Sequence, residues 1–89
     1  MCRNIKTLFN FDPPATAQEI QGASLQFVRK LSGFNKPSKA NEAAFAAAIS
    51  SIAAASRNLL GALETSAPPR TREAEAAKAR ARAAQRFPR

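Results

Sequence analysis

The chain has 89 residues, a net charge of +8, one cysteine and no histidine, and alanine supplies 21 of its apolar residues. Without histidine it has no imidazole base, no Ser-His or Cys-His nucleophile pair and no Cys/His zinc site, so we expect no enzyme activity, metal site or cofactor. The charge is uneven, because residues 65–89 hold seven basic and two acidic side chains, and this indicates an anionic partner.

The first predicted element is a short helix over residues 3–11. Ile5, Leu8 and Phe9 are spaced at i, i+3 and i+4, which places them on one helical face. The prolines at 13 and 14 end this segment, because proline cannot continue a helix. A helix this short needs a larger element to pack against.

The second predicted element is a helix over residues 17–32. Thr16 and Glu19 form the pattern of a capping box, in which each side chain accepts a hydrogen bond from the other residue's backbone N–H. Gly33 stands where a left-handed C-cap is expected. Arg29 and Lys30 occupy the last turn, where the helix dipole favours cations.

The third predicted element is a long helix over residues 39–64, with Ser38 as its N-cap. Its large apolar residues recur at intervals of three and four, as in one wall of a small helical bundle. The short connection to helix 17–32 favours antiparallel packing. The predicted core joins Ile20, Phe27 and Leu31 to Phe45, Ile49, Ile52, Leu59 and Leu63.

Alanines cover a second flank of the long helix. Two interpretations are open: the small side chains let another helix or a second copy of the protein approach closely, or alanine is present because it favours helix. The flank is made of Ala40, Ala44, Ala47, Ala48 and Ala55.

The chain ends in a predicted basic tail. A proline-containing hinge over residues 67–72 separates a helical domain, residues 1–66, from residues 73–89. The tail is rich in alanine and arginine and has an i, i+3 pair of Glu75 and Lys78, but no apolar stripe to bury. We therefore expect a partly frayed, solvated helix. The fold class is all-α, a small helical bundle with a helical tail.

Two classes of function agree with these features. One is a small accessory protein that binds RNA or DNA without sequence preference, through its tail and the loop between the two longer helices. The other is a protein-interaction or self-association module with no nucleic-acid role. The candidate phosphate contacts are Arg70, Arg72, Lys78, Arg80, Arg82 and Arg86 in the tail, and Arg29, Lys30, Lys36 and Lys39 around the loop.

Phe34 lies among the four basic residues around the loop. A phenylalanine near cations is typical of a surface that stacks bases and contacts phosphates. The alternative, which we favour, is that Phe34 packs inward beside the Gly33 cap.

Cys2 is the single thiol of the chain. Removal of Met1 would leave an N-terminal cysteine, and Arg3 beside it would favour the thiolate. We interpret it as an inert residue, and the alternative is a redox-sensing or cross-linking thiol. Catalysis is the least favoured role, because 89 residues without strands cannot build the large domain that N-terminal nucleophile enzymes need.

No uninterrupted apolar run approaches the ~18 residues of a membrane span, and the N-terminus lacks the pattern of a signal peptide. A single thiol also argues against an oxidising compartment. The sequence therefore predicts a cytoplasmic protein without a membrane span.

Three segments resemble a family of small bacterial proteins catalogued as a domain of unknown function: MCRNIKTLFNFDPPAT, LQFVRKLSGFNKPSKANEAAF and APPRTREAEAAKARARAA. This resemblance implies a soluble bacterial protein, and it supplies no activity, ligand or site residue. The segment LSGFNKPSKANEAAF is also similar to the helix-two-turns-helix module of formamidopyrimidine-type DNA glycosylases, which implies nucleic-acid contact, although the glycine-rich turn of that module is missing.

Overall fold

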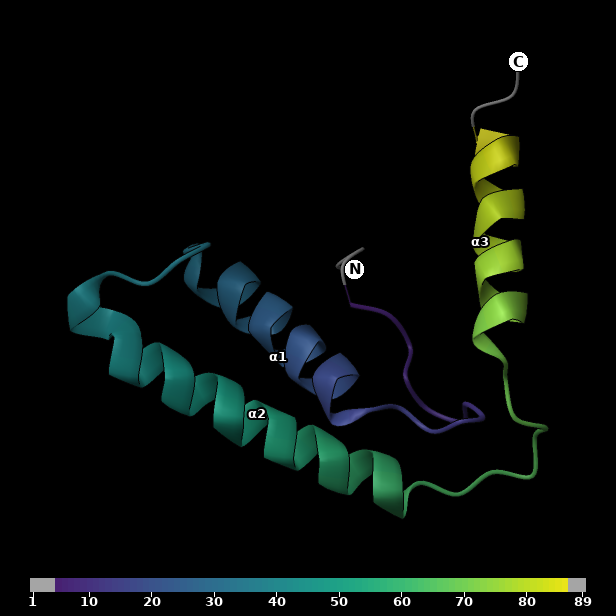
Figure 1. Ribbon diagram of the computed structural model, residues 1–89, viewed down its shortest axis with the longest axis horizontal. Coiled ribbons are helices and arrows are strands. Elements are labelled where there is room, and N and C mark those ends of the chain that lie inside the picture. The colour runs from purple at the N-terminus through teal and green to yellow at the C-terminus, as the bar shows by residue number, and fades with distance from the viewer. Residues whose placement is uncertain (1–4, 87–89) are drawn as a thin grey trace.

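The computed structural model describes residues 5–86, which form three α-helices and one 3₁₀ turn (Figure 1). The elements are α1 (Ala17–Ser32), η1 (Lys39–Asn41), α2 (Glu42–Ala62) and α3 (Arg72–Arg86). Between residues 5 and 86 there is no strand, only an isolated parallel bridge between Phe11 and Arg70. The all-α prediction is confirmed.

Local signals at both ends of α1 determine where this helix begins and ends. The Thr16 hydroxyl accepts a hydrogen bond from the Glu19 N–H at 3.1 Å, and the Glu19 carboxylate accepts one from the Thr16 N–H at 2.8 Å. At the other end Gly33 has φ 80°, a left-handed conformation that glycine adopts without the strain of a side chain. Both predicted caps are confirmed.

The Thr16 hydroxyl provides a stability test. Thr16→Ala is expected to lower the free energy of unfolding by about 1 kcal/mol, because the Glu19 N–H loses its partner. Thr16→Ser keeps the hydroxyl and should stay close to wild type. Urea unfolding followed by circular dichroism measures both variants, and an alanine variant as stable as the serine variant would contradict this role.

The long helix differs slightly from its prediction at both ends. The chain enters α2 through η1, and the Ser38 hydroxyl accepts a hydrogen bond from the Asn41 side chain at 2.9 Å instead of capping a backbone N–H. α2 ends at Ala62, because Leu63 is extended at φ −70° and ψ 142°. Gly61, a poor helix former, lies in the last turn.

α1 and α2 lie side by side as an antiparallel hairpin, and the core of the protein lies between them (Figure 1). The buried apolar residues are Ile20 and Val28 from α1, and Phe45 and Ala53 from α2. Ser24 is buried among them, and its hydroxyl donates to the Ile20 carbonyl at 2.8 Å. That bond satisfies the polar group, so a serine is tolerated in the helix contact.

The predicted core is right for Ile20 and Phe45 and wrong for four leucine and phenylalanine residues. Ile49 and Ile52 are half-buried. The buried row of α1 runs through Ile20, Ser24 and Val28, at intervals of four residues. Phe27 and Leu31 lie three residues after Ser24 and Val28, so they fall at the edge of this row and not in it. The residues predicted as core but exposed are Phe27 (45%), Leu31 (76%), Leu59 (56%) and Leu63 (44%).

The predicted N-terminal helix over residues 3–11 does not form in the described part of that segment, residues 5–11. Asn10 instead adopts φ 65°, a left-handed conformation that asparagine accepts more readily than most residues. Its carbonyl accepts a hydrogen bond from the Arg70 N–H at 2.7 Å. Pairing with a distant segment thus replaces the hydrogen bonds of a short helix that is unstable alone.

The helical run Lys39–Ala62 is long and apolar enough to cross a membrane, by length and composition only. Its apolarity comes largely from alanine. The mean hydropathy of an 18-residue stretch is therefore high enough for a membrane span, although no uninterrupted apolar run is present. Core helices of soluble proteins meet the same criterion, but little of this run is buried within the structure.

Candidate nucleic-acid interface

The predicted basic tail is a regular helix, α3, that stands away from the α1–α2 hairpin (Figure 1). No other helix of the described chain packs along it. Thr71 caps its start, because the Thr71 hydroxyl accepts a hydrogen bond from the Ala74 N–H at 3.1 Å. Glu73 and Glu75 in the first turn also favour the helix through its dipole.

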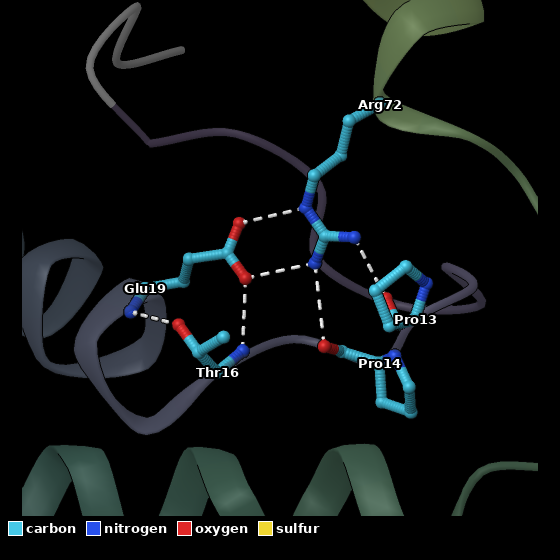
Figure 2. A network of polar contacts seen from close by, with 5 residues as sticks. All are labelled: Pro13, Pro14, Thr16, Glu19 and Arg72. Atoms are coloured by element: carbon cyan, nitrogen blue, oxygen red, sulfur yellow. Dashed lines mark hydrogen bonds and ion pairs between the residues drawn. The ribbon is translucent and has the colours of Figure 1, made fainter.

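Arg72 attaches α3 to the rest of the protein (Figure 2). Its guanidinium forms a two-point ion pair with Glu19, at 2.8 Å to Oε1 and 3.2 Å to Oε2. It also donates to the carbonyls of Pro13 at 2.7 Å and Pro14 at 3.3 Å. The guanidinium carbon lies 5.2 Å from the centre of the Phe11 ring, within the range of a cation–π contact. We call this set of contacts the Arg72 clamp.

The clamp changes the acidity of Glu19. The hydrogen bond from Arg72, together with that from the Thr16 N–H, lowers the pKa of Glu19 from 4.5 to about 2, against the opposing effect of partial burial. The pKa of Arg72 is raised, chiefly by its hydrogen bond to Glu19. One carboxylate thus closes the capping box of α1 and also holds the first turn of α3.

Backbone contacts strengthen the same junction. The Arg70 N–H donates to the Asn10 carbonyl at 2.7 Å, and the Asp12 N–H donates to the Arg70 carbonyl at 3.0 Å. The Asn10 side chain donates to the carbonyls of Ala67 and Pro68 at 3.3 and 3.1 Å. The segment predicted as a hinge, residues 67–72, therefore contacts residues 10–19 at several points. The division into domains stays a prediction.

The candidate phosphate contacts on α3 are not equivalent. Lys78 and Arg82 are four residues apart and share one side of the helix, while Arg80 lies on the other side. All three side chains are exposed, and Lys78 pairs with Glu75 at 3.6 Å, as predicted. Arg86 belongs to α3, but its side chain lies outside the described residues.

Two of the residues predicted to contact phosphate, Arg72 and Arg29, bind other groups of the protein instead. Arg72 uses four hydrogen bonds in the clamp, which leaves its guanidinium little capacity for a phosphate. Arg29 donates from Nε to the Asn35 carbonyl at 3.0 Å and so braces the loop between α1 and α2. Arg70 is exposed, although its backbone is paired.

The loop cations form a separate surface. Lys30, Lys36 and Lys39 are exposed, and the loop lies at the end of the hairpin away from α3 (Figure 1). Phe34 is 51% exposed, so the interpretation that it packs inward is wrong. The Gly33 cap is closed by backbone geometry and the Gly33 N–H bond to the Arg29 carbonyl, and neither needs the phenyl ring.

A family model matches residues 1–78, which is most of the chain. The chain belongs to the family DUF2277. The description of this family is "uncharacterized conserved protein". No curated protein and no solved structure is significantly similar to the chain.

The part of the chain that matches DUF2277 includes the Arg72 clamp and ends at Lys78 within α3. Arg80 and Arg82 lie beyond it. The resemblance to a small family of unknown function is therefore confirmed, and the basic helix is only partly covered by it.

Sequence reasoning missed the partners of Arg72 in this DUF2277 protein. The sequence patterns place Glu19 only in the capping box and Phe11 only in the short helix over residues 3–11. Glu19 and Arg72 are separated by 53 positions, and no local pattern joins residues that far apart. Cys2, interpreted as inert, lies outside the described residues.

Proposed function

We propose that this DUF2277 protein is a cytoplasmic binding protein, not an enzyme, that contacts the phosphate backbone of nucleic acids through α3 without sequence preference. The observation that carries the proposal is the exposure of Lys78, Arg80 and Arg82 on a helix that stands clear of the hairpin. α3 has no large apolar side chain, so its outer surface suits a charged partner better than an apolar one.

The chemistry of the helix favours backbone contact over base readout. Phosphate contacts by lysine and arginine supply affinity without sequence information, and specificity comes from hydrogen bonds to base edges. Between Arg72 and Arg86 the only uncharged polar side chain is that of Gln85. We therefore expect weak binding, with a Kd of about 10⁻⁴–10⁻⁶ M at physiological salt.

The Arg72 clamp supports the proposal because it orders the start of the binding helix in advance. A frayed helix loses conformational entropy when a partner orders it, and this loss weakens binding. Attachment at Arg72 lowers that cost for the first turns of α3. Arg72 is then a positioning residue, and the phosphate contacts are made by the cations that follow it on α3.

The test compares two variants with the same change in net charge. One carries Lys78→Gln, Arg80→Gln and Arg82→Gln on α3, and the other carries a matched triple substitution to glutamine at the loop. The loop positions are Lys30, Lys36 and Lys39. Fluorescence anisotropy of a labelled RNA and a labelled DNA duplex gives the affinity of each protein.

We expect the α3 variant to bind at least about tenfold more weakly than wild type, and the loop variant to stay within about threefold. For wild type on duplex DNA, about three phosphate contacts predict a slope of roughly −3 in log K against log salt. Equal losses in the two variants would show that net charge alone drives binding. No binding of wild type at low salt would refute the proposal.

A further inference from the structure

The turn between α1 and α2 presents two large apolar side chains to solvent. Leu31, in the last turn of α1, is 76% exposed, which makes it the most exposed large apolar residue of the described chain. Phe34 follows three positions later in the loop and is 51% exposed. Exposed large apolar side chains that lie close together are typical of an interaction site.

The loop that carries Phe34 is held in place by hydrogen bonds. The Phe34 N–H donates to the Ser32 hydroxyl at 3.2 Å, and Arg29 Nε donates to the Asn35 carbonyl at 3.0 Å. Gly33 closes α1 directly before Phe34. The backbone on both sides of the ring is thus tied to α1, and the exposure of Phe34 results from the geometry of the turn.

Three lysines accompany these apolar side chains, and all three are exposed. None of them forms an ion pair within the part of the chain that the structure describes. Residues 29–42 hold four basic side chains and one acidic, Glu42 at the start of α2. This end of the hairpin is therefore positively charged and favours an anionic partner. We call the set the hairpin tip: Lys30, Leu31, Phe34, Lys36 and Lys39.

The combination of cations and apolar side chains matches the layers of an anionic membrane. Such a membrane carries negative headgroups directly above an apolar layer of acyl chains. Lysine side chains can place their ammonium groups at the level of the headgroups while their methylene stems lie beside apolar groups. A nucleic-acid backbone offers phosphates to the lysines but no apolar layer to Leu31. The chemistry of the tip therefore fits an anionic lipid surface better than a nucleic acid.

We infer that the hairpin tip docks on an anionic membrane surface. Leu31 and Phe34 enter the boundary between headgroups and acyl chains, and the three lysines contact the headgroup phosphates. The contact is peripheral, and no helix crosses the membrane. The tip lies at the end of the hairpin away from α3, so α3 stays free for another partner (Figure 1).

This inference does not rest on the proposed function, because the tip and α3 share no residue. The two can therefore fail separately. A protein that binds DNA through α3 but binds no vesicles would refute only the docking. A protein that binds vesicles through the tip but no nucleic acid would refute only the proposed function.

The first test measures vesicle binding of two variants that keep the full net charge of the chain. One carries Leu31→Gln and Phe34→Gln at the tip. The matched control carries Leu59→Gln and Leu63→Gln, which replace two exposed large apolar residues at the other end of the hairpin. Co-sedimentation uses vesicles of phosphatidylcholine alone and of an equal mixture of phosphatidylcholine and phosphatidylglycerol, and circular dichroism confirms that each variant keeps its helices.

We expect wild type to bind the mixed vesicles and not those of phosphatidylcholine alone, because the lysines need negative headgroups. The tip variant should bind the mixed vesicles at least about tenfold more weakly, and the control should stay within about threefold of wild type. Failure of wild type to bind mixed vesicles, or equal binding to both kinds, would overturn the inference. A tip variant with unchanged vesicle binding would also overturn it, and weakened DNA binding in that variant would assign the tip to nucleic acid.

The second test follows insertion directly. The chain has no tryptophan, so Phe34→Trp introduces a single indole at the tip and Leu63→Trp introduces one at the other end of the hairpin. On mixed vesicles the emission of Phe34→Trp should shift to shorter wavelength and be quenched by brominated lipid, because the indole enters an apolar layer. The emission of Leu63→Trp should not change. A vesicle-bound Phe34→Trp protein with unshifted emission would overturn the inference.

Discussion

Phe45→Ala is expected to lower the free energy of unfolding by about 3–5 kcal/mol. Phe45 is the largest of the four buried apolar side chains in the described structure, and it is only 9% exposed. Small domains have about 5–15 kcal/mol of stability in total, and a chain of this length is near the low end. The variant should therefore be largely unfolded near physiological temperature.

Phe34→Ala is the matched control, since it removes the same ring from a site that is 51% exposed. We expect it to change the free energy of unfolding by well under 1 kcal/mol, as exposed substitutions usually do. Thermal melting of both variants by circular dichroism measures the difference. Equal melting temperatures for Phe45→Ala and wild type would show that the hairpin core lies elsewhere.

Arg72→Gln should release α3 from the hairpin. The substitution removes the ion pair with Glu19 and the cation–π contact with Phe11, while glutamine remains a good helix former. An isolated helix of 15 residues is marginal in water, so α3 should lose much of its helical content. Hydrogen exchange should show faster exchange in residues 72–86 and unchanged protection in α1. Unchanged protection in α3 would contradict the role of the clamp.

The same variant should change the pH dependence of stability. The pKa of Glu19 is about 2 in the folded chain, below its ordinary 4.5, so its contacts stabilise the fold above pH 4.5. That contribution is lost as the pH falls from about 4.5 towards 2. In Arg72→Gln the pKa of Glu19 should rise towards 4.5 and the loss on acidification should be smaller. Carboxyl chemical shifts of Glu19 across this range measure both pKa values.

Short-range signals in the sequence predicted α1 well. Thr16 and Glu19 cap its start, and Gly33 ends it through a left-handed conformation. Each of these effects involves residues within a few positions of one another, so their pattern is visible in the sequence. The pair of Glu75 and Lys78 on α3 is of the same kind.

Such local patterns could not predict the contacts between segments that are distant in the sequence. The spacing of Ile5, Leu8 and Phe9 favoured a helix, but backbone pairing of Asn10 and Asp12 with Arg70 determines the path of that segment. In the same way Phe27 matched an apolar stripe, whereas the contact with α2 buries the row of Ile20, Ser24 and Val28. Periodicity indicates that a helix has an apolar side, but the partner decides which residues of that side are buried.

The candidate interface shows the same difference between local features, which the sequence predicts, and contacts between distant residues, which it does not. Sequence alone identified the cations of the tail, because charge composition is a local property. It could not show that Arg72 is engaged by Glu19, that Arg29 braces its own loop, or that the loop cations lie away from α3. These facts reduce the candidate phosphate contacts of α3 to the cations after the clamp.

The most direct test of the central claim, that α3 is the surface which meets nucleic acid, is a titration of ¹⁵N-labelled protein with a short DNA duplex followed by NMR. Lys78 to Arg82 should show the largest amide shift changes, and residues 34–39 of the loop should show little change. At higher salt the changes should disappear together, because phosphate contacts are lost with rising ionic strength. Shift changes centred on the loop, or none at all at low salt, would contradict the claim.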